Sequence, residues 1–209
     1  MAVNDFQDQE EIENFKHFWR KYGRWAFYVL LLAAAGYLGW VLYQGHQREQ
    51  NDKASVVFET FINQSRAHNE AAAKQALLTL QQDFGNTLPA AQATLLMAGT
   101  DFDAAKYDDA AKHLQWVQKR QKDELLQAIT AQRLAVVYLQ QQKYDDALKA
   151  LDAKVSDDLK PVLLETRGDV LVAQGKPKEA AAAYEAALKL LPEDAPQREL
   201  LQMKADPLS

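Results

Sequence analysis

The sequence contains no cysteine, and its histidines are few and scattered. Without thiols the chain has no cysteine nucleophile, no disulfide framework and no cysteine-ligated metal site. The four histidines lie in four separate segments, without the i, i+4 spacing of a helical metal site. Glycine-rich phosphate loops and nucleophile elbows are also missing from the sequence. We therefore expect no enzyme activity, no cofactor and no metal.

Basic residues do not outnumber acidic residues. The chain of 209 residues carries 24 basic and 29 acidic residues, a formal net charge of −5. It has no basic stripe, which argues against nucleic acid as a partner. Clusters of β-branched residues are few, whereas alanine, leucine and glutamine are abundant. This composition predicts an all-α fold.

A charge-free run extends from Trp25 to Tyr43, WAFYVLLLAAAGYLGWVLY. As a helix it would be about 28 Å long, close to the thickness of the hydrocarbon core of a bilayer. Aromatic side chains stand at both of its ends, as they do where headgroups meet hydrocarbon. The run therefore predicts a transmembrane helix over residues 25–43. Within it, Ala35 and Gly39 form a small-xxx-small pair, a candidate contact face for another transmembrane helix.

Two other interpretations of this run remain open. One is a buried helix of a soluble domain, although charge-free runs of this length with aromatic ends are uncommon there. The other is a cleaved signal peptide, because residues 33–35 are all alanine and offer a small-x-small cleavage site. Against cleavage, the apolar residues continue past these alanines, and the preceding leader carries five acidic residues.

Basic residues near the run predict its orientation. Four precede it and two follow it: Lys16, Arg20, Lys21 and Arg24 before, Arg48 and Lys53 after. By the positive-inside rule, residues 1–24 are a cytoplasmic leader and the C-terminal part lies on the periplasmic side of a bacterial inner membrane. Residues 4–22 also show apolar side chains at helical spacing, which predicts an amphipathic helix on the membrane or against a partner. A frayed leader that only supplies orienting charge is the alternative.

The C-terminal part repeats itself. KYDDAAKHL (106–114), KYDDALKAL (143–151) and KPKEAAAAY (176–184) follow one another at intervals of 37 and 33 residues. Periods near 34 with this content are typical of tetratricopeptide repeats, in which paired helices cross at small residues. The small positions are Ala98, Ala135 and Gly168 on first helices, and Ala110, Ala147 and Ala180 on second helices; the large positions are Leu114, Leu151 and Tyr184.

This register predicts the organisation of the C-terminal part, residues 44–209, as a right-handed helical solenoid. We expect a divergent hairpin over 52–84, repeats over about 89–120, 125–155 and 161–192, and a closing helix over 196–205. Gly85 and Asn86 should end the first hairpin in a left-handed cap. The longer first interval is assigned to a linker, QKRQKDE, at 118–124.

Acidic pairs recur at the hairpin turns, Asp108 with Asp109 and Asp145 with Asp146. We expect them to cap the second helix of each repeat and to complement its positive end. An alternative is a pair of carboxylates for acid–base catalysis, which their equivalent positions in two repeats disfavour.

The first helices of such repeats line a concave groove, which is the candidate binding site. The expected lining residues are Gln92, Leu95 and Phe102 from the first repeat, Ile129, Gln132 and Val136 from the second, and Val162, Glu165 and Asp169 from the third. No lysine, arginine or asparagine is expected on this wall. The groove should therefore be apolar and mildly acidic, suited to an apolar polypeptide segment. For Val136 a core position packed on a neighbouring repeat is the alternative.

The order of these parts resembles the YfgM family of Gram-negative bacteria. The resemblance covers nearly the whole chain: a short leader, a single span that continues into residues 43–47, degenerate repeats, and a tail with Gln202, Met203 and Lys204 before a short polar end. It implies an ancillary subunit of the SecYEG translocon, with a periplasmic repeat domain that works beside the PpiD chaperone. Such a subunit would help to pass translocated polypeptides to periplasmic folding factors. A scaffold for cell-envelope assembly, binding other envelope proteins through the same repeats, is the alternative function.

Overall fold

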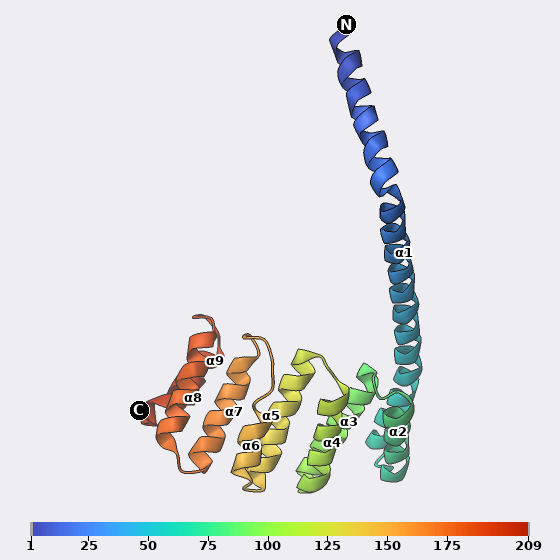
Figure 1. The fold of residues 1–209 in the computed structure, drawn as a ribbon. Helices are drawn as coiled ribbons and strands as arrows, with labels where there is room; N and C mark the ends of the chain where they lie inside the picture. The colour runs from blue at the N-terminus through green and yellow to red at the C-terminus, as the bar shows by residue number, and fades with distance from the viewer. Residues whose placement is uncertain (1, 209) are drawn as a thin grey trace. The chain divides into compact units, whose positions relative to one another are not determined.

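The computed structural model describes the backbone of residues 2–208 and the side chains of residues 19–207 except residue 21. All secondary structure in this part of the chain is helical (Figure 1), which confirms the all-α fold. The chain divides into two units, residues 1–50 and 51–209, and each is described by itself. The amphipathic face predicted for the leader depends largely on side chains outside the described residues.

The first unit consists of the long helix α1 (Ala2–Arg66), whose last turns, from Asn51 onward, belong to the second unit. The predicted leader helix and the predicted transmembrane helix are thus joined, together with the residues after them, in one continuous helix. The reason is that the first 88 residues contain no proline, and an isolated glycine inside a helix costs only about 1 kcal/mol. From Tyr22 onward α1 includes a segment long and apolar enough to cross a membrane, and its large apolar side chains are exposed.

The second unit is a row of helical hairpins, in which the end of α1 pairs with α2, α3 with α4, α5 with α6, and α7 with α8 (Figure 1). The short helix α9 and a final 3-10 turn follow. The bounds are α2 Glu70–Asp83, α3 Leu88–Asp103, α4 Tyr107–Arg120, α5 Glu124–Gln140, α6 Tyr144–Ala150, α7 Lys160–Ala173, α8 Pro177–Leu190, α9 Gln197–Ala205 and η1 Asp206–Leu208.

Each hairpin turns at a residue with positive φ: His68, Ala105, Gln142 and Gly175. At each turn this residue donates its backbone N–H to the carbonyl three residues before it, and the next residue donates to the carbonyl five residues before itself. This left-handed arrangement satisfies carbonyls at the end of the first helix. The turn before α2 therefore has the same geometry as the three repeat turns, although its sequence has diverged.

The acidic pairs do not cap their helices. The N-cap residues of α4 and α6 are Lys106 and Lys143, and neither makes a side-chain capping bond. The lysine takes the N-cap position because it directly follows the left-handed turn residue, so the aspartates fall in the first helical turn. There their charge suits the helix dipole, as expected. Asp108 also accepts a hydrogen bond of 2.8 Å from Gln141 of the next hairpin, which links successive repeats.

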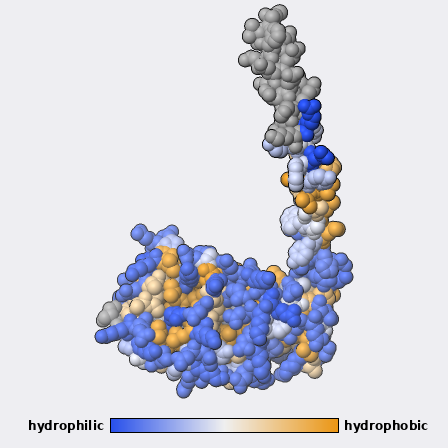
Figure 2. Space-filling view, in the orientation of Figure 1, coloured by the Kyte–Doolittle hydropathy of each residue, from blue (hydrophilic) through white to orange (hydrophobic). Residues whose placement is uncertain are grey.

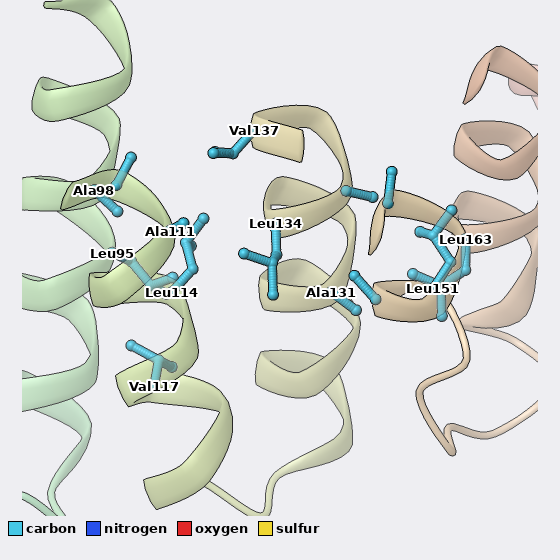
Figure 3. Packing of buried hydrophobic residues seen from close by; sticks show 14 of the residues in the cluster. Leu95, Ala98, Ala111, Leu114, Val117, Ala131, Leu134, Val137, Leu151 and Leu163 are labelled. Carbon is cyan, nitrogen blue, oxygen red and sulfur yellow. The ribbon is translucent and has the colours of Figure 1, made fainter. Parts of the chain in front are cut away.

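The small and large positions meet where the helices of a hairpin cross. A Cβ atom built on Gly168 of α7 would lie 2.6 Å from Cδ1 and Cζ of Tyr184 on α8, so only glycine leaves room for this ring. The corresponding pairs in the other repeats are an alanine and a leucine. Figure 3 shows the apolar cluster that runs through α3 to α7, with Leu95, Leu114 and Leu134 from three successive helices.

One local prediction at a helix end is wrong. Gly85 does not adopt positive φ. It is buried instead at a close approach, where a Cβ would lie 2.8 Å from the carbonyl oxygen of Gln81. The segment 118–124, assigned to a linker, contains residues 121–123, which connect the end of α4 at Arg120 to the start of α5 at Glu124.

Candidate protein-binding groove

The groove lies between the first helices of two repeats, α3 and α5. Helix α4 packs on both of them, and α5 packs directly on α7, whereas α3 and α5 are not among the closely packed helix pairs. Side chains of α3 and α5 therefore face an open space that the backbone does not fill. The spacing of these helices, rather than any loop, creates the groove.

Two hydrogen-bonded loops fix the starts of α3 and α5 next to each other. The side chain of Gln121, before α5, donates to the carbonyl oxygens of Gly85 and Thr87, before α3, at 3.4 and 3.3 Å. The backbone N–H of Leu88 donates to the Asn51 side chain at 3.2 Å, which attaches α3 to the end of α1. The groove is therefore held open by the repeat framework before any ligand binds.

The groove has two adjoining parts. The amino-end part, with a volume of about 940 Å³, is lined by the beginnings of α3 and α5, by Asn51 and Phe58 of α1, and by the loops before α3 and α5. The carboxyl-end part, of about 600 Å³, is lined by the later turns of α3 and α5, with Leu114 of α4. Leu95, Leu96 and Arg133 line both parts. The two parts thus form one channel along the helices.

The structure places six of the nine predicted lining residues in this groove. Gln92, Leu95 and Ile129 line the amino-end part, and Leu95, Phe102, Gln132 and Val136 line the carboxyl-end part. Val136, for which a core position was the alternative, is half-buried and contributes to the lining.

Three leucines that the sequence analysis did not select are exposed in the groove. Leu88, Leu96 and Leu125 are 50%, 48% and 54% exposed, and all line the amino-end part. Clustered exposure of this kind is a feature of interaction sites rather than of ordinary surface. Figure 2 shows apolar patches between hydrophilic rims on the visible face of the repeat unit. The missed signal was the i, i+4 spacing of Leu88 and Leu96 with Gln92 and of Leu125 with Ile129.

The expectation of a wall without lysine, arginine or asparagine is wrong. Arg133 lines both parts of the groove, and Asn51 and Asn86 line the amino-end part. Arg133 follows Ile129 by four residues and therefore shares its helix face, a spacing that the sequence already contained. The two asparagines lie outside the repeat register, on α1 and on the loop before α3, so the register did not indicate them.

The three predicted residues of the third repeat lie elsewhere. Val162 packs against the central apolar cluster. Glu165 and Asp169 bind Lys204 of α9, with its Nζ at 2.8 Å from Glu165 Oε1 and 2.9 Å from Asp169 Oδ1. The closing helix thus supplies one positive charge that is shared by both carboxylates of this part of the wall.

Tyr184 completes this cluster beneath α9. Its hydroxyl donates a hydrogen bond of 2.8 Å to Asp169 Oδ1, and Lys204 Nζ lies 5.8 Å from the centre of its ring. Burial, together with the bond to Asp169, raises the pKa of Tyr184. Burial disfavours the charged form of Lys204, but the hydrogen bonds to Glu165 and Asp169 outweigh it and raise the lysine pKa above 10.5. The cluster fastens α9 to α7 and α8.

The candidate contact face on α1 is open. Ala35 is exposed, and nothing lies within 4 Å of a Cβ built on Gly39. In the part of the chain that the structure describes, no three histidine or acidic side chains gather as a metal site would require. The groove is therefore the candidate site with the most favourable geometry.

Comparison with known proteins assigns the family. A family described as a tetratricopeptide repeat-like domain matches residues 16–209. An ancillary SecYEG translocon subunit of Neisseria gonorrhoeae is 49% identical over 205 residues, 97% of each chain. This chain belongs to the family of ancillary SecYEG translocon subunits. The resemblance inferred from the sequence is thereby confirmed.

Other ancillary SecYEG translocon subunits are less similar but extend over much of the chain. The Haemophilus influenzae protein is 29% identical over 87% of this chain and 88% of its own. The Escherichia coli protein is 27% identical over 97% of each. The family match begins at residue 16, before the charge-free run, so it includes the apolar segment of α1 together with the repeats.

Proposed function

We propose that this chain is a membrane-anchored, translocon-associated protein that binds apolar polypeptide segments in the groove between α3 and α5. The names of its relatives supply the association with a SecYEG translocon. The observation that carries the binding role is the groove itself, lined by half-exposed leucines on a rigid helical frame. Burying such leucines against a partner removes apolar surface from water at about 25 cal/mol per Å².

The proposed location is a bacterial inner membrane, with α1 crossing once, residues 1–24 in the cytoplasm and the repeats in the periplasm. The basic residues before the span support this orientation. Protease added to spheroplasts should then degrade the repeat unit while the leader stays protected. Degradation of the leader alone would show that the chain has the opposite orientation.

The proposed partners are the SecYEG translocon, a PpiD-like periplasmic chaperone and polypeptide clients. In this role the groove receives emerging segments on the periplasmic side, and the chain helps to pass them to chaperones. The open face at Ala35 and Gly39 is the proposed contact with other transmembrane helices. Purification in mild detergent should recover SecYEG and the chaperone with the chain, and their absence would instead favour the scaffold of envelope assembly.

Site-specific photocrosslinking tests the groove. A photoreactive residue at Ile129 should crosslink to translocating polypeptides or to the partner chaperone. Leu78 is a matched control, because it is a half-exposed leucine on α2 that lines neither part of the groove. Equal crosslinking from both positions would contradict the proposal. Val162, packed against the central apolar cluster, should crosslink less than Ile129.

A further inference from the structure

Arg133 occupies an unusual position for a basic side chain. It lies on α5 between Ile129 and Val136 and lines both parts of the groove, together with Leu95 and Leu96. Its surroundings on the two helices are mainly apolar. Arg133 is exposed and so accessible to a ligand, and a guanidinium forms charge-assisted hydrogen bonds to a carboxylate.

The other three arginines of α2–α9 have structural partners. Arg167 pairs with Asp152, Arg198 donates to the carbonyl oxygens of Leu188 and Leu191, and Arg120 lies over the ring of Trp116. Among the described residues, Arg133 has no such hydrogen bond, ion pair or ring contact. Its five donors are therefore available to a ligand in the groove.

Acidic side chains stand at the two ends of the groove. Asp123 lines the amino-end part, where it also caps α5, and Asp103 lines the carboxyl-end part. Asp103 is the last residue of α3, where the helix dipole disfavours a negative charge. The charges along the channel therefore run acidic, basic, acidic, and a complementary ligand has the reverse order.

We propose that the groove selects apolar polypeptide segments that carry an internal aspartate or glutamate, which Arg133 binds. This inference rests on the proposed function and adds a sequence preference to it. The segment places apolar side chains on both sides of its acidic residue, against Leu88 and Leu125 at one end and Phe102 at the other. A basic residue beyond the apolar part faces Asp103.

The position of Arg133 favours an internal carboxylate over a chain terminus. Leu88 to Asp103 extends over about 22 Å of helix, which matches about seven residues of extended peptide. Arg133 lines both parts and so lies along this length rather than at its end. A peptide that ended at Arg133 would leave one part of the groove empty.

The test measures fluorescence anisotropy of labelled peptides with the full chain in lipid nanodiscs, after subtraction of binding to empty nanodiscs. The probes are leucine-rich peptides of about 12 residues with lysine at both ends, acetylated and amidated. Their central residue is aspartate, asparagine or lysine. A fourth peptide has central asparagine and a free C-terminal carboxylate.

The aspartate peptide should bind about tenfold more tightly than the asparagine peptide, as a charged hydrogen bond predicts. Arg133→Glu should remove this preference and favour the lysine peptide instead. Lys74→Glu is the matched control, since Lys74 is exposed on α2 and lines neither part of the groove, and it should leave all affinities unchanged.

Equal affinity of the three amidated peptides would overturn the role of Arg133 while leaving the groove as an apolar binding site. A preference for the free carboxylate over the internal aspartate would also overturn it. Loss of affinity for all peptides alike in Arg133→Glu would show a general rather than a selective effect, and would refute the proposal. Crosslinking from Ile129 tests the proposed function separately.

Discussion

The close approach of Gly168 to Tyr184 makes a sharp prediction for the change Gly168→Ala. The new methyl group would lie 2.6 Å from two ring carbons, inside the distance at which one of the groups must move. The ring has little freedom to do so, because Tyr184 is only 2% exposed and its hydroxyl is bonded to Asp169. The substitution therefore strains the helix crossing and, as the ring moves, breaks that hydrogen bond.

The expected loss of unfolding free energy is about 2 kcal/mol. Overpacking costs about 1–3 kcal/mol, and a broken hydrogen bond about 1 kcal/mol more. Against these, alanine is about 1 kcal/mol better than glycine inside a helix. The steric terms exceed the propensity term, so the variant should be less stable than the parent.

Gly99→Ala is the matched control. Gly99 is also a helical glycine, but nothing lies within 4 Å of a Cβ built on it. Gly99→Ala should therefore stabilise the chain by up to about 1 kcal/mol, whereas Gly168→Ala should destabilise it. Denaturant unfolding of the full chain in detergent, followed by circular dichroism, would measure both. Stabilisation by Gly168→Ala would refute the steric reasoning.

A second substitution tests the same contact from the other side. The equivalent pairs in the other repeats are Ala98 with Leu114 and Ala135 with Leu151. Gly168→Ala in a Tyr184→Leu background should therefore cost much less than in the parent, because a leucine leaves room for the methyl group. Equal costs in both backgrounds would show that the ring is not the cause.

Two further predictions concern the turns and the closing helix. Replacing Ala105 or Gln142 by glycine should raise the free energy of unfolding by up to about 1 kcal/mol each, because both residues adopt the left-handed conformation that glycine accepts without strain. Gly175→Ala should lower it by about 1 kcal/mol for the same reason, and a drop for all three variants would contradict this account. Lys204→Met should loosen α9, which amide hydrogen exchange of its backbone would detect. The pKa of Lys204 is raised in the folded chain, so its contribution to stability is complete below pH 10.5 and is lost as the pH rises through the folded pKa. The Lys204→Met variant should not show this loss.

Local patterns predicted much of the fold. The helix α2, with Ala73, Ala76, Leu77 and Leu80 buried, follows from apolar spacing alone. The hairpin register followed from the alanines, because a helix crossing requires a small residue at a fixed offset. The left-handed cap at Gly85 was a wrong prediction because a glycine also serves where backbones approach closely, and sequence does not distinguish the two uses.

The lining residues of the candidate groove could be predicted from the sequence only in part. Ile129 and Gln132 were predicted as lining residues from their places on the first helix of a repeat. Arg133 was missed, although it follows Ile129 by four residues, because the repeat alignment did not select its position. Glu165 was expected in the groove, but its partner Lys204 is 39 residues away, and a local pattern does not identify partners at that distance.

The sequence by itself determined the helical composition, the apolar segment of α1 and the period of the repeats, because these depend on neighbours within a few turns of the chain. Only the tertiary structure decided that α3 and α5 stand apart while α5 packs on α7. That spacing is a property of packing between helices that are separate in the sequence. The groove, and the place of Arg133 along it, follow from this spacing.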